Sequence, residues 1–315
     1  MSNIVLETKE LTKTFGTLTA VNKLSLQVNE GEVFGFLGPN GAGKTTSINM
    51  ICGLLAPTSG EVKLKGVPLV NGNRDQRRVV GMCPQSIVLW ERLTCIEQLE
   101  FMGQMYDLTA AQAREAGRRL LNELGLEDKS NSLARTLSGG MQRRLNLAMA
   151  LVHDPELVVL DEPEAGLDPQ SRVKVREYIQ SLARKKTVII TTHNMDEAER
   201  VADRIAIIDH GELLVQDTPE RLKQSLGEGD QVDIHLDNGT HDPAEAQAAL
   251  SRLTSHVKYD SESQHLKIRA LNAVGNLAEI LEALRNAGFK PGEVNIHANT
   301  LEDVFIQLTG RRLRE

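Results

Sequence analysis

Long apolar runs, paired cysteines and an excess of basic residues are all missing from this sequence. No stretch approaches the ~20 consecutive apolar residues that a membrane helix needs, and the start, MSNIVLETKE, lacks a basic region followed by an apolar run. Any attachment to a membrane is therefore expected to come through a partner. Cys52, Cys83 and Cys95 form no CxxC pair, which favours a reducing compartment and makes the cytoplasm the expected location.

The overall charge is negative, because 36 Lys and Arg residues stand against 43 Asp and Glu residues. Proteins that bind nucleic acid by neutralising phosphates usually carry a basic excess, so we expect no nucleic-acid partner. The hydrophobic fraction of 40% and charged fraction of 25% are ordinary for a folded protein and argue against disorder or a fibrous repeat. A length of 315 residues predicts two domains, since domains usually hold about 100 to 200 residues.

Strand and helix patterns alternate through residues 1–226, which predicts one α/β domain around a mostly parallel sheet. Apolar runs typical of strands lie at residues 23–28, 32–37, 61–65, 157–160, 187–191 and 204–208. Strand signals disappear between about 94 and 153, where Thr94 with Glu97 and Thr109 with Gln112 have capping-box spacing. This segment is predicted to be a helical insert.

A different pattern begins after residues 227–230, a predicted linker, and residues 231–315 are expected to form a small α+β domain. Apolar residues alternate, as in half-buried strands, at residues 232–236, 257–259, 266–268 and 294–296. Helices are predicted to begin at Asp242 with Pro243, to follow from Val274, and to end the chain from Leu301. The order β-α-β-β-α-β is that of the ferredoxin-like split βαβ unit, here with an added helix.

The string GPNGAGKT, residues 38–45, matches the glycine-rich phosphate-binding (P-loop) pattern and lies between a predicted strand and a predicted helix. Glycines at 38, 41 and 43 allow positive φ and let backbone N–H groups converge on phosphate oxygens at the helix start. Lys44 would neutralise the β- and γ-phosphates of ATP, and the Thr45 hydroxyl would bind Mg²⁺. The expected nucleotide contacts are Asn40, Gly41, Gly43, Lys44, Thr45 and Thr46. The alternative, a glycine-rich turn without a ligand, is disfavoured by the complete match.

The string LVVLDEP, residues 157–163, predicts a buried strand that ends in two carboxylates. The carboxyl ends of parallel strands border the crevice in which α/β sheets bind ligands. Asp161 would hold Mg²⁺, and Glu162 would activate the attacking water as a general base. Alone, the pair could equally be exposed and cap the next turn, but the phosphate loop favours the catalytic interpretation.

With these motifs, the string LSGGM at residues 137–141 resembles the signature of the ATP-binding cassette (ABC) nucleotide-binding domain, a P-loop NTPase fold. In that family the signature faces the γ-phosphate held by the opposing subunit, so Ser138, Gly139 and Gly140 would complete the site of a second copy. The resemblance therefore implies a homodimer with two shared ATP sites, together with a permease on a separate chain. An ordinary Ser-capped helix is the alternative.

Further matches to the family follow in its usual order across residues 4–225. Gln85 resembles the glutamine that links the Mg²⁺ and water site to the membrane partner, and His193 the histidine that contacts the γ-phosphate. Asp168 resembles part of the loop that crosses the dimer interface, although it could equally be a helix N-cap. Phe15 resembles the aromatic residue that stacks on adenine, with Val21 on the same side, whereas an isolated Phe would more often belong to the core.

The sequence departs from the family pattern at Met141, where Gln is usual, and at Glu164, where Thr or Ser is common. Glu164 places an extra negative charge near the catalytic carboxylates, and we expect it to modulate activity at most. Residues 86–106, with Trp90 among apolar neighbours, correspond to the part of relatives that meets the membrane subunit. An exposed docking patch and a local hydrophobic core are both compatible with this composition.

The strings LEDVFIQLTGR at 301–311 and TTHNMDEAE at 191–199 resemble ATP-binding subunits of type 2 exporters of the daunorubicin-resistance group. The resemblance implies ATP hydrolysis that energises export of a drug or another small or hydrophobic substrate. The chain would then lie at the cytoplasmic face of the cell membrane, held there by its permease. The basic residues at 311–314 are expected to form a solvated tail.

Two functions from other classes compete with that interpretation. A soluble ABC ATPase would act without a membrane partner, but such proteins usually fuse two cassettes or insert long coiled coils, and neither is seen in this sequence. A regulatory module would sense nucleotide without useful turnover, and the Asp161–Glu162 pair together with His193 argues against it.

Overall fold

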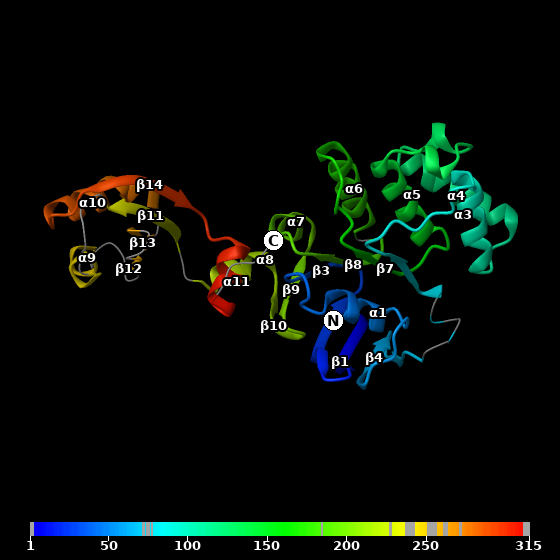
Figure 1. Cartoon of the computed structure of the whole chain (residues 1–315), viewed down its shortest axis with the longest axis horizontal. Coiled ribbons are helices and arrows are strands. Elements are labelled where there is room, and N and C mark those ends of the chain that lie inside the picture. The colour runs from blue at the N-terminus through cyan, green and yellow to red at the C-terminus, as the bar shows by residue number, and fades with distance from the viewer. Residues whose placement is uncertain are drawn as a thin grey trace. The chain divides into compact units, whose positions relative to one another are not determined.

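The computed structural model consists of two compact units, Met1–Pro219 and Glu220–Arg312 (Figure 1). The structure describes residues 3–70, 73, 76, 78–183, 185–226, 229–236, 243–250, 257–260, 264–270 and 273–310. Residues 227 and 228 of the predicted linker, the predicted helix start at Asp242 and the basic tail at 311–314 lie outside the described residues. Within the described part, none of the helices combines the length and apolar character that crossing a membrane requires.

A six-stranded sheet in the order β10-β9-β3-β8-β7-β6 forms the centre of the first unit. Its strands are β3 (Val33–Leu37), β6 (Val80–Cys83), β7 (Leu157–Asp161), β8 (Thr187–Thr192), β9 (Arg204–Asp209) and β10 (Glu212–Asp217). All neighbouring strands are parallel except the β9–β10 pair, so the predicted mostly parallel sheet is confirmed. Every residue of β3, β7 and β8 is buried, which explains why these segments are apolar without alternation.

A second, four-stranded antiparallel sheet in the order β2-β1-β4-β5 lies in the same unit, and the sequence patterns did not predict it as a separate sheet. Its strands are β1 (Ile4–Phe15), β2 (Leu18–Asn29), β4 (Ser59–Leu64) and β5 (Val67–Pro68). Several register shifts interrupt the β1–β2 pairing, and each shift breaks the period-two pattern by which a strand is recognised. Leu6 and Leu24 of this sheet share one core with Phe36 of β3 and Ile48 of helix α1 (Lys44–Ile51).

Helices occupy the segment predicted to be a helical insert and lie to one side of the six-stranded sheet, with β1 and β4 to another (Figure 1). Its elements are α3 (Cys95–Met105), α4 (Ala110–Glu123), the 3-10 turns η1 (Glu127–Lys129) and η2 (Ala134–Thr136), and α5 (Gly139–Leu151). Both capping boxes are present, because Thr94 accepts from Glu97 N and Thr109 accepts from Gln112 N. Two further helices of this unit are α6 (Pro169–Leu182) and α7 (Met195–Val201), and α8 (Pro219–Gln224) begins at the boundary with the second unit.

The second unit contains an antiparallel sheet in the order β12-β13-β11-β14. Its elements are β11 (Asp230–Leu236), α9 (Pro243–Leu250), β12 (Val257–Asp260), β13 (His265–Ala270), α10 (Ala273–Asn286), β14 (Pro291–His297) and α11 (Leu301–Thr309). The helix predicted from Val274 is present, and of the apolar residues whose spacing predicted it Leu284 is buried, whereas Val274 is 72% exposed and α10 buries Ala273 and Ile280 as well. Three to four residues complete a helical turn, so Ala273 shares the Ile280 and Leu284 face and Val274 turns away from it.

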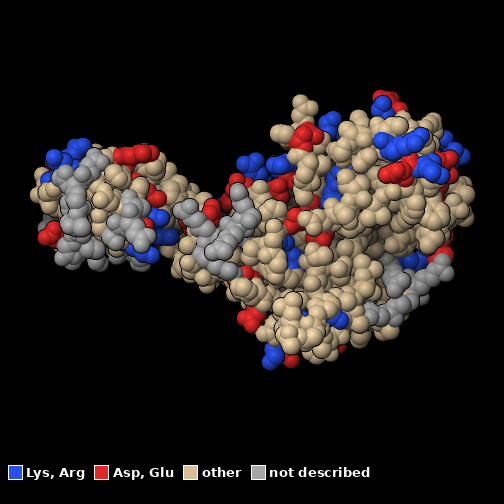
Figure 2. All heavy atoms as spheres, in the orientation of Figure 1, with Lys and Arg blue, Asp and Glu red and all other residues tan. Residues whose placement is uncertain are grey.

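On the face that Figure 2 shows, the described Lys and Arg side chains are interspersed with Asp and Glu side chains. They do not gather there into one broad patch of a single sign.

Candidate nucleotide site

The loop at residues 38–46 connects β3 to α1 and borders a pocket of about 260 Å³. The residues that line it are Ala20, Asn40, Gly41, Gly43, Lys44, Thr45, Thr46, Gln85 and Glu162. Every loop residue that the sequence assigned to nucleotide binding therefore borders one pocket. Gln85 and Glu162, which are far away in the sequence, face the same space.

Two of the loop glycines have positive φ, and one does not. Gly41 has φ 82° and Gly43 has φ 97°, in the left-handed region that favours glycine. Gly38 does not use the positive φ that glycine allows, since it is not among the positive-φ residues. Glycine is required there for another reason, because a Cβ at Gly38 would overlap the carbonyl oxygen of Ile208 on β9.

Lys44 is only 6% exposed, although it carries an ammonium group. Its Nζ donates to the carbonyl oxygens of Gly38 at 2.7 Å and Pro39 at 3.1 Å, and lies 3.7 Å from Glu162 Oε1. Burial lowers the pKa of Lys44, and the nearby carboxylates of Glu162 and Asp161 oppose that lowering. The loop thus positions a buried cation at the pocket, where phosphate oxygens would supply compensating charge.

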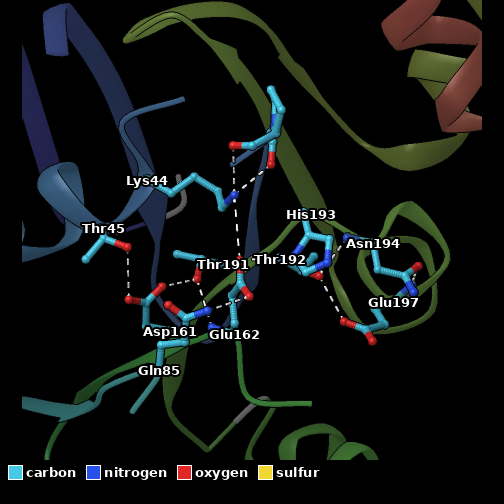
Figure 3. A network of polar contacts seen from close by, with 12 residues as sticks. Lys44, Thr45, Gln85, Asp161, Glu162, Thr191, Thr192, His193, Asn194 and Glu197 are labelled. Carbon is cyan, nitrogen blue, oxygen red and sulfur yellow. Dashed lines mark hydrogen bonds and ion pairs between the residues drawn. The ribbon is translucent and has the colours of Figure 1, made fainter. Parts of the chain in front are cut away.

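Glu162 is the residue at which several segments meet (Figure 3). Its Oε2 accepts a hydrogen bond from Gln85 Nε2 at 3.0 Å, and its Oε1 lies 3.1 Å from His193 Nδ1. The backbone of Glu162 has φ 47°, a conformation that costs roughly 1–2 kcal/mol for a residue with a side chain. Its N–H donates to Thr191 Oγ1 at 2.9 Å, which helps to hold this strained turn. The carboxylate is therefore buried and fixed from several sides.

Asp161, the last residue of β7, joins the start of α1 to the end of β8. It accepts a hydrogen bond from Thr45 Oγ1 at 3.2 Å and a further one from Thr191 Oγ1. Sequence reasoning missed Thr191 as a member of this network. Asp161 and Thr191 are register partners across β7 and β8, so only the strand pairing, once known, identifies this contact.

His193 lies between β8 and α7, and the turn that carries it is well bonded. Asn194 N donates to Thr192 Oγ1 at 2.9 Å, and the Asn194 side chain caps α7 by accepting from Asp196 N and Glu197 N. Thr192 Oγ1 in turn donates to Glu197 Oε2 at 2.9 Å. These bonds hold the turn so that His193 Nδ1 is directed at Glu162.

The signature residues and Asp168 lie near one another but do not line the loop pocket. Ser138 is the N-cap of α5 and accepts from Met141 N at 3.3 Å. Asp168 is the N-cap of α6 and accepts from Ser171 Oγ at 2.6 Å and from Ser171 N at 3.0 Å, and these two bonds lower the pKa of Asp168. Both N-cap interpretations are thus confirmed, and contact with a nucleotide on a second copy stays a prediction. A Cβ on Gly140 would overlap Ser171 Oγ, whereas one on Gly139 would meet nothing within 4 Å.

Phe15 and Val21 differ in exposure at the edge of the site. Phe15 is 49% exposed, so the alternative that it belongs to the core is wrong. Lys13 Nζ lies over the Phe15 ring, 5.2 Å from its centroid. Val21 is buried, and its Cγ2 would lie 3.4 Å from a Cβ on Gly43.

Glu164, one of the two departures from the family pattern, is neutralised by a close partner. It is 3% exposed, and Arg176 of α6 donates to Oε1 at 3.0 Å and to Oε2 at 2.6 Å. The paired geometry is the bidentate arrangement in which an arginine compensates a buried carboxylate well. The extra charge is therefore largely balanced before it can act on Asp161 or Glu162.

Comparison with known proteins fits this geometry. The model of the ABC transporter family matches residues 21–165. Nod factor export ATP-binding protein I of Burkholderia orbicola is 39% identical over 318 residues, with 100% of each chain covered. A daunorubicin resistance ATP-binding protein of Streptomyces coeruleorubidus is 36% identical, with 96% of each chain covered.

Solved structures show the same fold. One is a dimeric ATP-binding cassette in a post-hydrolysis state, bound to ADP and Pi, with a TM-score of 0.62 and 28% identity. The match covers 68% of this chain and 98% of that chain. The full-length relatives, the family match and the P-loop fold together show that this ATP-hydrolysing chain belongs to the ABC transporter family, in the group of exporter ATP-binding subunits.

Proposed function

We propose that this chain binds and hydrolyses ATP to drive a membrane exporter, and that it works as a homodimer that closes on two shared nucleotide sites. The observation that carries the proposal is the position of Glu162, buried at the loop pocket with Lys44, Gln85 and His193 around its carboxylate. The relatives named for Nod factor export and daunorubicin resistance support the exporter assignment.

In the proposed reaction, Glu162 is the general base that takes a proton from the water attacking the γ-phosphate. Lys44 and the backbone N–H groups of the loop hold the β- and γ-phosphates, and His193 contacts the γ-phosphate. Catalysis then rests on positioning and on charge that is already in place before the transition state forms.

The residues present fit a Mg²⁺ ion beside the phosphates. Thr45 offers a hydroxyl oxygen, Asp161 a carboxylate and Gln85 an amide oxygen, and Mg²⁺ prefers such hard oxygen ligands. Thr45 Oγ1 and Asp161 Oδ2 already lie 3.2 Å apart, so ligands from two segments converge. The ion would neutralise charge that develops on the β- and γ-phosphate oxygens.

The homodimer is proposed because the signature residues do not line the loop pocket of their own chain. Ser138, Gly139, Gly140 and Asp168 do not line it, yet the start of α5 carries open space at Gly139. We propose that this helix start binds the γ-phosphate held by a second copy, through its unpaired N–H groups. The dimeric cassette with ADP and Pi supports this arrangement.

A substitution at Glu162 tests the function. Glu162→Gln keeps the shape of the side chain but removes the base, so ATP should still bind while turnover falls by at least ~100-fold. Glu164→Gln is the matched control, because Glu164 is equally buried but is paired with Arg176 away from the pocket. It should cost some stability and leave turnover within about threefold, since general-base catalysis does not involve it. Full turnover in Glu162→Gln would contradict the proposal.

The membrane partner is proposed to dock on an apolar patch beside Gln85. The patch consists of the exposed residues Ile87, Val88, Trp90, Phe101 and Met105. Trp90 and Phe101 stack edge to face with ring centroids 5.0 Å apart, which gives the patch a rigid aromatic centre of the kind that interfaces favour. The chain would thereby attach to the cytoplasmic face of the cell membrane.

Co-purification separates this partner from the soluble alternative. Full-length chain isolated from detergent-solubilised membranes should elute with a multi-helix permease. Recovery of the chain entirely in the soluble fraction, with full ATPase activity and no permease, would contradict the exporter role.

The second unit is proposed to be an accessory or regulatory domain of the ferredoxin-like type. Its elements follow the order β-α-β-β-α-β, and its strand order and antiparallel pairing agree with that fold. We propose domain limits of 1–226 and 231–315, with a helical subdomain at about 94–153.

A further inference from the structure

Arg143 is a buried arginine near the start of α5 whose partners are all backbone carbonyl oxygens. It is 2% exposed. Nη1 donates to Pro84 O at 2.6 Å and Gln85 O at 2.9 Å, while Nη2 donates to Asp161 O and Glu162 O at 2.8 Å each. Nε donates to Pro163 O at 3.0 Å. The guanidinium has five N–H donors, so these bonds use all of them.

The carbonyl groups that Arg143 binds belong to two loops of the catalytic site. Gln85 follows β6, Glu162 follows β7, and their side chains are themselves bonded to each other at 3.0 Å. Within the described residues, no carboxylate lies within ion-pair distance of Arg143. A buried charge is costly unless it is fully hydrogen-bonded, and the Arg143 guanidinium meets this condition by donating to five carbonyl oxygens from the two loops.

Asn146, one turn further along α5, extends this contact with the loop after β6. Its Nδ2 donates to Cys83 Sγ at 3.2 Å, and its Oδ1 accepts from Val88 N at 3.3 Å. The same face of α5 therefore holds the loop on both sides of Gln85. Of these two side chains, Arg143 also bonds the backbone of Glu162, and Asn146 does not.

We infer that Arg143 is a positioning residue for hydrolysis, which holds Gln85 and Glu162 in register with each other and with α5. The residue does not touch the nucleotide pocket, so its effect should fall on the catalytic step rather than on ATP binding. Because α5 also carries Ser138 at its start, a shift of that helix start would reach Glu162 through the Arg143 fork.

Arg143→Lys is the decisive variant, because it keeps the charge but offers three donors at one nitrogen, which cannot span acceptors in two loops. Arg204→Lys is the matched control. Arg204 likewise bridges acceptors from another part of the chain, the Gln27 carbonyl and the Glu32 carboxylate, but it lies at the start of β9, at the opposite end of the sheet from the loop pocket.

The experiment uses the purified full-length chain and measures the dissociation constant for ATP, KM, kcat per ATP-binding-competent site, and the melting temperature. For Arg143→Lys, kcat should fall at least tenfold while KM and the dissociation constant change by less than threefold. Arg204→Lys should lower the melting temperature without changing kcat per competent site.

A kcat per competent site within twofold of wild type, or a loss equal to that of Arg204→Lys, would overturn the inference. If Arg143→Lys does not fold, Arg143→Gln serves the same test, because it fits the space and still cannot bridge both loops. Failure here differs from failure of the proposed function, which would appear as retained turnover in Glu162→Gln.

Discussion

Two helices of the first unit, α1 and α5, begin beside glycines, but the side chains and the surroundings of the two helix starts differ. At α1, Gly43 adopts φ 97° and Lys44 is buried, while Thr45 Oγ1 donates to Asp161. At α5, Ser138 uses its side chain to cap its own helix, and Gly139 faces open space. Of these two starts, only that of α1 borders the loop pocket.

The difference shows that a helix start is not a complete anion site. Both helices offer unpaired N–H groups and the positive end of a dipole, worth about 0.3–1 kcal/mol near the surface. At the start of α1 the chain adds the buried Lys44 ammonium and the Thr45 hydroxyl beside the Asp161 carboxylate, so this helix start can bind phosphate within one copy of the chain. The start of α5 adds only the neutral Ser138, so its contribution to the proposed site depends on phosphate held by another copy.

The largest expected effect is on ATP binding, and it distinguishes Gly43 from Gly41 in the loop before α1. In Gly43→Ala, a Cβ would overlap the carbonyl oxygen of Ala20, so the loop must move and the dissociation constant for ATP should rise at least ~100-fold. Gly41→Ala is the matched variant, because nothing lies within 4 Å of its Cβ position. Gly41→Ala costs only the strain of alanine at positive φ, about 1 kcal/mol, which corresponds to a roughly fivefold loss of ATP affinity.

Calorimetric titration with ATP checks this pair, with the melting temperature as a control for folding. Equal losses in both variants would mean that backbone conformation, and not the close approach of Ala20, decides the fit of the loop.

A smaller effect is expected at the second start, on stability. In Gly140→Ala the new Cβ would overlap Ser171 Oγ, which should lower the free energy of unfolding by about 1–3 kcal/mol. Gly139→Ala has open space and should leave stability unchanged or raise it by up to about 1 kcal/mol, because alanine favours a helix over glycine.

Denaturant unfolding measures both variants. The double variant Gly140→Ala with Ser171→Gly removes the overlapping atoms and should recover most of the loss, as expected for contacting residues. No recovery would show that Gly140 is needed for something other than the space that Ser171 occupies.

The parts of the site that the sequence predicted are those that local chemistry determines. A strand, a glycine loop and a helix in succession fix the phosphate loop, and an apolar strand ending in Asp161 and Glu162 fixes the carboxylates. The family resemblance then pointed to Gln85 and His193, which the structure brings to Glu162.

The parts that the sequence did not predict depend on contacts between distant segments. Arg143 acts through carbonyl groups, which every residue has and which leave no pattern in the sequence. Thr191 meets Asp161 only because β7 and β8 pair in one particular register. Likewise, the sequence alone leaves Glu164 as an unbalanced charge, whereas in the structure it pairs with Arg176, about two turns along α6.

The smallest expected effect distinguishes a helix cap from half of a site. Ser138→Ala and Thr109→Ala each remove a cap whose bond is 3.3 Å long, to Met141 N and Gln112 N. Each should lower the free energy of unfolding by about 1 kcal/mol. Neither residue lines the loop pocket, so ATP affinity should stay within twofold for both.

Turnover should then separate them, because only Ser138 lies where a second copy would bring its γ-phosphate. Steady-state ATPase rates at saturating ATP should fall severalfold in Ser138→Ala and stay unchanged in Thr109→Ala. Equal rates would mean that Ser138 is only a helix cap and that the nucleotide site consists of the loop before α1 without the start of α5. Both hydroxyls accept a bond from a helix N–H, in a capping box at Thr109 and without one at Ser138, but only Ser138 adjoins the signature glycines. A fall in turnover confined to Ser138→Ala would therefore come from the surroundings of Ser138 and not from the loss of a cap.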